Sequence, residues 1–105
     1  MTMSRYKVDF NSMNWETLMP GLNQKSFNTQ NKQIRLVEYA KQMQPHVCEK
    51  MHCGYVIDGI LETSFENETV VYRPGDFIFI PGGAEHRHVG KTLTEKVRVI
   101  FVEDI

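Results

Sequence analysis

Apolar and polar side chains alternate over short segments through most of this chain, and turn-forming residues separate the segments. Such a period of two places successive side chains on opposite faces of a strand, and the segments are rich in β-branched and aromatic residues. The pattern predicts strands at residues 34–43, 52–57, 60–65, 69–72, 77–80, 86–89 and 96–102. Short strands at this spacing indicate an all-β sandwich or barrel.

Turn signals stand between these predicted strands. Asp58-Gly59 between two apolar stretches favours a hairpin, and further turns are predicted at 66–68, 73–76 and 81–83. The preceding region, 11–32, is polar and amide-rich with scattered apolar anchors. We expect one domain over residues 1–105, in which residues 1–33 wrap around a barrel formed by residues 34–105.

Several predicted strands are apolar on both faces. Phe77 and Phe79 alternate with Ile78 and Ile80, and the segment 96–102 shows the same double pattern. One face fills the barrel, and the other needs cover because a monomer rarely exposes a large apolar patch. We expect a homodimer to supply that cover; the alternative is that the amino-terminal segment does.

Length and charge limit the class of protein. The chain has 105 residues, 12 of them basic and 13 acidic, which gives a formal charge of −1 and no basic stripe of the kind that binds nucleic acid. No apolar run reaches membrane-spanning length, and residues 1–10 carry charges rather than an apolar stretch. These features favour a cytoplasmic protein that binds neither nucleic acid nor membranes.

The chain contains two cysteines, Cys48 and Cys53. Because they are five residues apart, they would face opposite sides of one continuous strand and could not form a disulfide without a bend. Two free thiols are typical of a reducing compartment.

All four histidines fall in two short windows. His46 and His52 share one strand parity with Cys48, and His86 and His88 share a parity in the later window. Imidazole and thiolate are the usual donors for zinc and other late first-row metals. The spacing therefore favours a metal site where the two windows meet inside the barrel.

These residues resemble the first of the two motifs of the cupins, usually written Gly-x5-His-x-His-x3-4-Glu-x6-Gly. The chain offers His46, Cys48, His52 and Gly59 at these spacings. Ala40 stands at the place of the opening glycine, Cys48 replaces the second histidine and His52 replaces the glutamate. A cysteine and a histidine in these places are similar to a subgroup of small single-domain cupins.

The second cupin motif, Gly-x5-Pro-x-Gly-x2-His-x3-Asn, is matched more closely. Gly75, Pro81, Gly83 and His86 stand at its positions, and Gly90 replaces the asparagine. The resemblance implies a jelly-roll barrel, the double-stranded β-helix of that family. It also implies that His46, Cys48, His52 and His86 hold a metal.

This ligand set would supply three imidazoles and one thiolate, whereas the usual set supplies three imidazoles and one carboxylate. A softer anion favours zinc or a similar late divalent transition metal over magnesium or calcium. A thiolate beside an oxygen-activating metal risks oxidation, which argues against an iron oxygenase. We expect zinc, while nickel, manganese, iron and copper stay open.

Each candidate ligand also has a structural interpretation. Cys48 could be a small apolar filler and His46 an exposed loop residue, whereas His52 and His86 stand at motif positions. His88 could replace His46 as a ligand, carry protons as a catalytic residue near neutral pH, or simply line the cavity.

Two function classes agree with these patterns. The first is a metalloenzyme acting on a small molecule, with an open coordination position and a spare histidine for proton transfer. The second is a non-catalytic cupin that binds a metabolite or a metal as a sensor or stabilising module. A closed set of four protein ligands would favour the second class.

Overall fold

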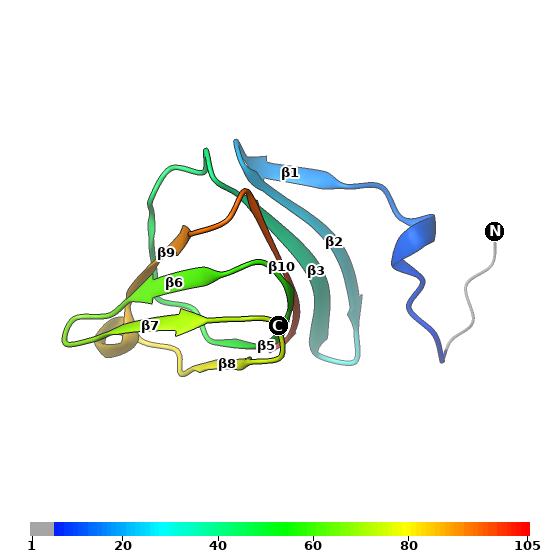
Figure 1. The fold of residues 1–105 in the computed structure, drawn as a ribbon. Helices are drawn as coiled ribbons and strands as arrows, with labels where there is room; N and C mark the ends of the chain where they lie inside the picture. Colours follow the sequence, from blue (N-terminus) through cyan, green and yellow to red (C-terminus); the bar gives the residue numbers. More distant parts are fainter. Residues whose placement is uncertain (1–5) are drawn as a thin grey trace.

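The computed structural model describes residues 6–105, which form two antiparallel sheets (Figure 1). The six-stranded sheet has the order β1-β2-β3-β10-β5-β8, and the four-stranded sheet has the order β4-β9-β6-β7. The bounds are β1 (Glu16–Met19), β2 (Leu22–Thr29), β3 (Lys32–Ala40), β4 (Val47–Cys48), β5 (His52–Asp58), β6 (Leu61–Ser64), β7 (Thr69–Tyr72), β8 (Phe77–Ile80), β9 (His88–Thr92) and β10 (Lys96–Asp104). Two short 3-10 turns complete the described elements: η1 (Phe10–Ser12) precedes β1, and η2 (Ala84–His86) lies between β8 and β9.

The all-β jelly-roll architecture predicted from the sequence is confirmed. The predicted strands 69–72 and 77–80 are β7 and β8. The predicted turn at Asp58-Gly59 joins β5 to β6, but these strands lie in different sheets and do not pair, so the turn connects the two sheets and is not the hairpin that the sequence predicted. Gly59 has a φ of +83°, a conformation that glycine adopts without steric cost. The two sheets curve around a common interior, with β6, β7 and β9 facing β3 and β10 (Figure 1).

The later histidine window differs from the predicted strand at 86–89. Gly83 and Ala84 accept the amides of His86 and Arg87 at 3.1 and 3.3 Å, which closes the turn η2. Strand β9 therefore begins only at His88. His86 and His88 therefore do not lie on one strand, and the prediction that their side chains face the same way, which assumed a continuous strand, does not apply.

The amino-terminal region is more regular than the wrapping loop expected there. Strand β2 pairs with β3 along its length, from Leu22 opposite Tyr39 to Thr29 opposite Lys32. Strand β1 then pairs with β2 and extends the sheet. Among the described residues before β1, η1 lies beyond the edge of the sheet (Figure 1).

Strand β10 shows how the double apolar pattern is used. Val97, Val99 and Phe101 are buried between the sheets, whereas Arg98 and Val102 are exposed on the outside. The same inward alternation on neighbouring strands completes the core, which comprises Leu22, Val37, Val56, Leu61, Tyr72, Ile78, Ile80, Val97, Val99 and Phe101. Burial of these side chains is the main driving force for closing the barrel.

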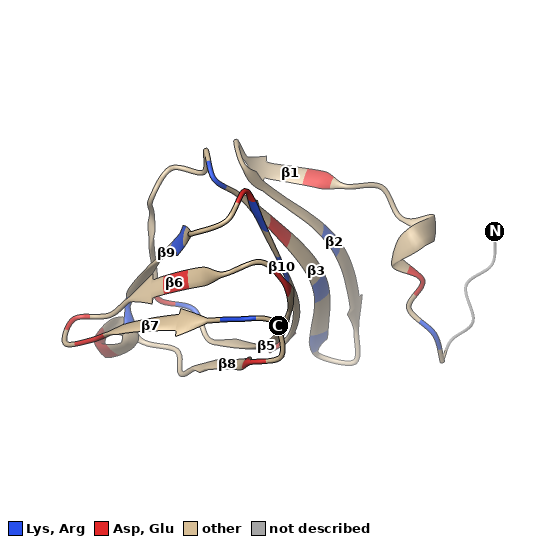
Figure 2. Ribbon diagram, in the orientation of Figure 1, with Lys and Arg blue, Asp and Glu red and all other residues tan. Residues whose placement is uncertain are grey.

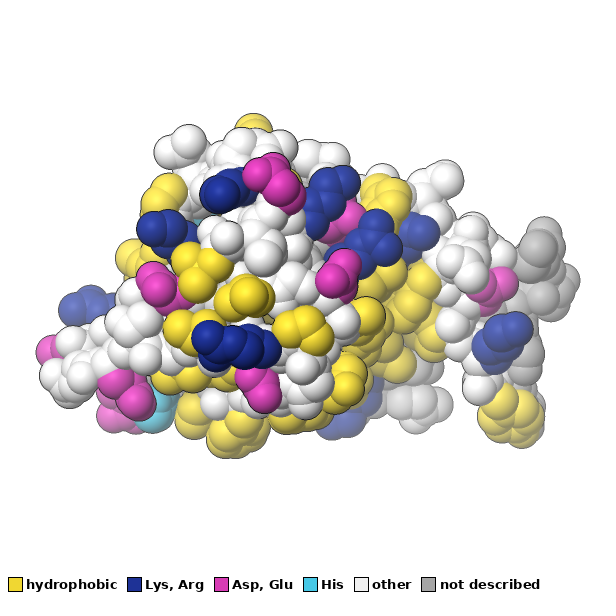
Figure 3. All heavy atoms as spheres, in the orientation of Figure 1, with side chains coloured by type: hydrophobic (Ala, Val, Ile, Leu, Met, Phe, Trp, Pro, Cys, Tyr) yellow, Lys and Arg dark blue, Asp and Glu magenta, His cyan; other side chains and the backbone are white. Residues whose placement is uncertain are grey.

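The outside of β5, β8 and β10 carries large exposed apolar side chains. We call Tyr55, Ile57, Phe77, Phe79 and Val102 the outer apolar face; Phe77 is 59% and Phe79 67% exposed. Hydrophobic side chains gather along the lower edge of the molecule in Figure 3, where β8 lies in Figure 1.

The amino-terminal segment covers a different part of this sheet. Trp15 stacks near Lys25 and Arg98, whose charged groups lie 4.8 and 5.8 Å from its ring centroid. Lys25 also donates to the carbonyl of Phe10 at 2.9 Å. The segment therefore packs over β2 and the start of β10, while the outer apolar face stays exposed.

Charges of both signs are spread over the described strands (Figure 2). Many are paired across neighbouring strands: Glu38 accepts from Arg98 at 2.9 Å and lies 3.7 Å from Lys96, and Lys32 pairs with Asp104. This distribution agrees with the absence of a basic stripe in the sequence. Within residues 6–105, no helix has the length and apolarity required to span a bilayer.

Candidate metal centre

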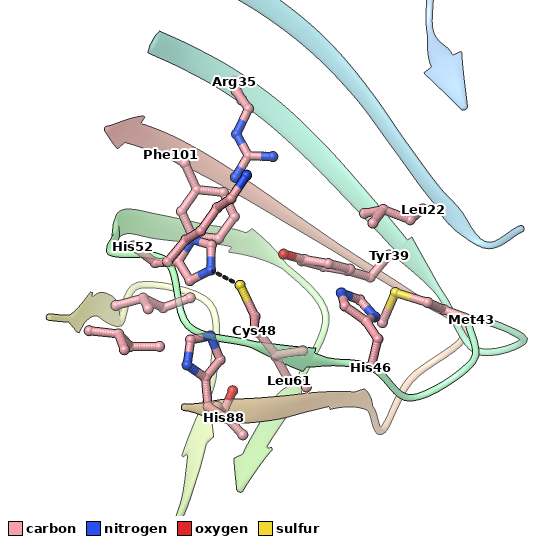
Figure 4. A pocket seen from close by; sticks show the side chains of 15 residues that line it. Leu22, Arg35, Tyr39, Met43, His46, Cys48, His52, Leu61, His88 and Phe101 are labelled. Atoms are coloured by element: carbon pink, nitrogen blue, oxygen red, sulfur yellow. Dashed lines mark hydrogen bonds between the residues drawn. The ribbon is translucent and has the colours of Figure 1, made fainter. Parts of the chain in front are cut away.

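Three side chains that could hold a metal ion meet at one end of the barrel, between the two sheets (Figure 4). Cys48 on β4 pairs directly with His88 on β9, and His52 begins β5 in the other sheet. The chain crosses from one sheet to the other between Cys48 and His52, which turns both side chains toward the interior. We call Cys48, His52 and His88 the donor triad.

The spacing of the donor triad fits a single transition metal ion. One donor atom from each residue lies within 4.8 Å of the other two, and Cys48 Sγ is 3.4 Å from His52 Nε2. Tetrahedral zinc holds sulfur at about 2.3 Å and nitrogen at about 2.1 Å, so two such donors stand about 3.6 Å apart. The separation of Cys48 Sγ and His52 Nε2 is close to this value, and His88 places a third donor atom within 4.8 Å of both.

His52 is oriented by a carboxylate from the core. Its Nδ1 donates to Glu103 Oε2 at 2.7 Å, which leaves the lone pair of Nε2 directed toward Cys48. Arg35 donates to both oxygens of Glu103, from Nε at 2.8 Å and from Nη2 at 3.0 Å. Carboxylates behind ligating histidines commonly fix the tautomer and strengthen the ligand.

Glu103 is ionised in this environment. Burial raises the pKa of its carboxyl, but hydrogen bonds from His52 and Arg35, together with the guanidinium charge, outweigh burial and hold the pKa below its usual value. Glu103 therefore accepts the proton on His52 Nδ1 without titrating near neutral pH.

His88 is oriented by backbone instead of a side chain. Its Nδ1 lies 3.0 Å from the carbonyl oxygen of His86, and because a carbonyl only accepts, Nδ1 carries the proton and Nε2 keeps its lone pair. Burial lowers the pKa of His88 and the hydrogen bond to the His86 carbonyl raises it; burial has the larger effect, so the pKa lies below its usual value. The ring is neutral at pH 7, the form in which imidazole binds metals.

The donor triad lies in the wall of a cavity of about 160 Å³. Its polar lining consists of Arg35, Tyr39, His46, Cys48, Lys50, His52, Thr63 and His88. Its apolar lining includes Leu22, Met43, Leu61, Ile78, Ile80 and Phe101. An engineered cavity of ~150 Å³ holds benzene, so the space suits a small organic molecule.

The Tyr39 hydroxyl points into this cavity on the side of His52 and Cys48 (Figure 4). Burial raises the pKa of Tyr39 to about 12, so its hydroxyl is protonated at neutral pH and can donate a hydrogen bond. None of the hydrogen bonds among residues 6–105 involves this hydroxyl.

The remaining two histidines lie outside the donor triad, at different places. His46 lines the same cavity but is exposed, and its Nδ1 lies 3.4 Å from the carbonyl of Gln44. His86, in η2, lies 3.8 Å from the carboxylate of Glu85 and lines a separate surface pocket with Glu66 and Glu68. The motif histidine at 86 thus contributes its carbonyl oxygen to the centre, through His88.

Sequence reasoning missed Glu103 and Arg35. The signal was present, because Glu103 shares the parity of the inward residues Val97, Val99 and Phe101, and a carboxylate on the buried face of a strand requires a partner. Arg35 is its partner, on the inward face of the neighbouring strand β3.

Comparison with known proteins agrees with this geometry. The sequence profile of the Cupin domain family matches residues 35–103. Among curated proteins, none matches the chain significantly.

Solved structures share the fold over most of the chain. KdgF from Halomonas sp. is 26% identical, with a TM-score of 0.69 over 88% of this chain and 86% of its own. An RmlC-like cupin from Shewanella frigidimarina is 17% identical, with a TM-score of 0.73 over 99% and 94%. A putative ethanolamine utilization protein Q from Salmonella typhimurium is 19% identical, with a TM-score of 0.71 over 91% and 82%.

Proposed function

The chain belongs to the cupin domain family, and from this premise we propose that it is a metal-dependent enzyme acting on a small molecule. Cys48, His52 and His88 hold one divalent transition metal ion at the wall of the cavity. The observation that carries the proposal is the convergence of three donor atoms within 4.8 Å of one another beside a cavity of about 160 Å³.

The number of donors favours catalysis over a purely structural ion. Structural zinc is usually closed by four protein ligands, whereas catalytic zinc keeps three and leaves a position for water or substrate. The donor triad supplies three ligands next to a cavity, which supports an accessible fourth position. His88, which the sequence offered either as a ligand in place of His46 or for proton transfer, is proposed as a ligand here, and His86 is not.

Each residue around the ion has a definable task. When bound, the ion supplies Lewis-acid activation of a small molecule in the cavity. Cys48 provides the one negative charge of the ligand set, Glu103 holds the proton of His52, and the protonated Tyr39 hydroxyl donates a hydrogen bond to the bound molecule.

We propose zinc as the ion. A thiolate with two imidazoles is a donor set that late divalent metals prefer, and the Sγ to Nε2 separation of 3.4 Å suits zinc. The free thiols of Cys48 and Cys53 support a reducing, cytoplasmic setting in which the thiolate stays available.

Elemental analysis of purified protein tests this ligand set. We expect about one zinc per chain in the wild-type protein and in His86→Gln, and loss of the metal in Cys48→Ser, His52→Gln and His88→Gln. His86→Gln is the matched control because it removes an imidazole two residues from His88 and keeps the backbone carbonyl. Circular dichroism verifies that each variant is folded.

Two outcomes contradict the proposal. If zinc survives in His88→Gln and is lost in His86→Gln, the motif histidine is the ligand. If zinc-loaded wild-type protein holds no metal after gel filtration, the cavity binds its ligand without an ion. In a Cys53→Ser background, zinc should also protect Cys48 from thiol reagents.

We further propose that the protein is a homodimer. The outer apolar face contains five large side chains on three adjacent strands, and the amino-terminal segment packs elsewhere on the sheet. A contiguous exposed apolar patch of this kind favours burial against a second subunit.

A further inference from the structure

We propose that the ligand of this cavity is a small carboxylic acid with an apolar body, whose carboxylate is held by Lys50 and Arg35. The inference rests on the proposed function, because the acid would lie beside the ion held by the donor triad. It adds the chemical class of the ligand, which neither the family nor the donor triad specifies.

The charged side chains that line the cavity are of one sign. Arg35 and Lys50 are cationic, and no aspartate or glutamate is among its lining residues within the described part of the chain. Glu103, the nearby carboxylate, accepts from His52 and Arg35 and offsets the charge of that guanidinium. The excess positive charge at the cavity therefore comes from Lys50 and from a divalent ion, on which a thiolate leaves one net positive charge, and this excess attracts an anion.

Several hydrogen-bond donors of the cavity have no partner among residues 6–105. Lys50 makes no ion pair and no hydrogen bond with any residue from 6 to 105. Arg35 uses one N–H each of Nε, Nη1 and Nη2, for Glu103 and Gln24. A guanidinium has five N–H groups, so one on each terminal nitrogen remains for a ligand.

The Tyr39 hydroxyl adds a third donor on the same side of the cavity. It points inward between Arg35 and Cys48 in Figure 4 and has no hydrogen-bond partner within residues 6–105. Cationic and hydroxyl donors together satisfy the lone pairs of a planar carboxylate.

The rest of the cavity wall is apolar, which favours a ligand whose remaining atoms are also apolar. Leu22, Met43, Leu61, Ile78, Ile80 and Phe101 line it with aliphatic and aromatic surface. A sugar or a polyol would leave hydroxyls unpaired against this wall, which costs free energy. A compact aliphatic or aromatic acid fits both the polar and the apolar parts.

The test compares acids with their neutral amides on zinc-loaded protein by isothermal titration calorimetry. Benzoate and butyrate should bind at least about tenfold more tightly than benzamide and butyramide, the ratio expected for a charge-assisted hydrogen bond. Lys50→Gln should remove most of this preference without changing zinc content. Lys91→Gln, which removes an equal charge from an exposed strand position outside the cavity, should keep it.

The outcomes separate this inference from the proposed function. Equal binding of acid and amide, no binding of either acid at millimolar concentration, or tighter binding of inorganic phosphate overturns it, even if zinc is present. If no zinc binds, the same titrations on metal-free protein decide: a preference for benzoate that Lys50→Gln abolishes supports the carboxylate site on its own, and its absence overturns it.

Discussion

At the scale of single residues, the centre depends on how each histidine is protonated. His52 Nδ1 donates to a carboxylate and His88 Nδ1 donates to a carbonyl, so both rings direct Nε2 inward. An imidazole without such a partner would divide its population between tautomers and orientations, and metal affinity would fall. Glu103 is thus a positioning residue that acts through His52.

Glu103→Gln should lower zinc affinity by about 10–100-fold, because an amide of equal size cannot supply the anionic acceptor that fixes His52. Competition with a chromophoric chelator measures the affinity, and thermal unfolding verifies the fold. The variant also leaves Arg35 without its counterion, so we expect a modest loss of stability of about 1–3 kcal/mol.

Asp104→Asn is the matched control, because Asp104 follows Glu103 on β10 but faces solvent, where it pairs with Lys32. We expect it to change stability by less than about 0.5 kcal/mol and to keep zinc affinity. Wild-type affinity in Glu103→Gln would show that His52 is oriented by other contacts.

At the scale of elements, the turns that connect the two sheets decide which residues reach the centre. The turn that links β5 in one sheet to β6 in the other passes through Gly59. The end of β6 then pairs with β9, so Ser64 lies opposite Val89 and next to the start of β9 at His88. A disturbance of this turn would shift the sheet that carries Cys48 and His88.

Gly59→Ala should destabilise the protein by about 2–4 kcal/mol. A β-carbon there would approach the carbonyl oxygen of Lys96 to 2.1 Å, and the φ of +83° costs an L-residue about 1–2 kcal/mol by itself. Urea unfolding followed by circular dichroism measures the change in the free energy of unfolding.

Gly90→Ala provides the comparison, because a β-carbon at this position of β9 would meet only Leu61 Cδ1, at an ordinary 3.7 Å. We expect its effect to stay within about 1 kcal/mol, since alanine also reduces the backbone entropy of the unfolded chain. Similar effects of the two substitutions would mean that the turn adapts and does not fix the sheet.

At the scale of the whole molecule, the two faces of the six-stranded sheet have different roles. The inner face closes the barrel and carries Glu103, Arg35 and His52 toward the cavity. The outer apolar face is left without cover by residues 6–105. Because the same strands form both faces, a subunit interface there would support the sheet directly behind the centre.

The double variant Phe77→Lys with Phe79→Lys should convert the proposed dimer into a monomer, since two charges on adjacent outward positions of β8 cannot be buried without partners. Sedimentation equilibrium measures the mass in solution. Leu93→Lys, at a 40%-exposed position outside the outer apolar face, should leave the mass unchanged.

A monomeric wild-type protein at micromolar concentration would contradict the homodimer. So would a double variant that sediments as the wild type does. Either result would mean that the outer apolar face serves another purpose.

The sequence by itself determined the class of fold and most of its strands. Alternation with a period of two fixes which residues share a face, and glycine and proline fix where a strand must turn, so β7, β8 and the turn at Gly59 followed from local preference. Local preference did not show that this turn leads from one sheet to the other. The motif spacing also placed Cys48 and His52 on the inward side.

Only the tertiary structure decided which groups complete the centre. The turn η2 ends at His86 and takes this side chain away from the centre, whereas a hydrogen bond to the His86 carbonyl orients His88. Strand parity gave both histidines the same facing and could not foresee that they would separate. Glu103 lies 51 residues from His52 in the chain, and their contact exists because β10 pairs with β5 across the sheet. Local sequence sets the facing of a side chain, whereas long-range strand pairing sets its neighbours.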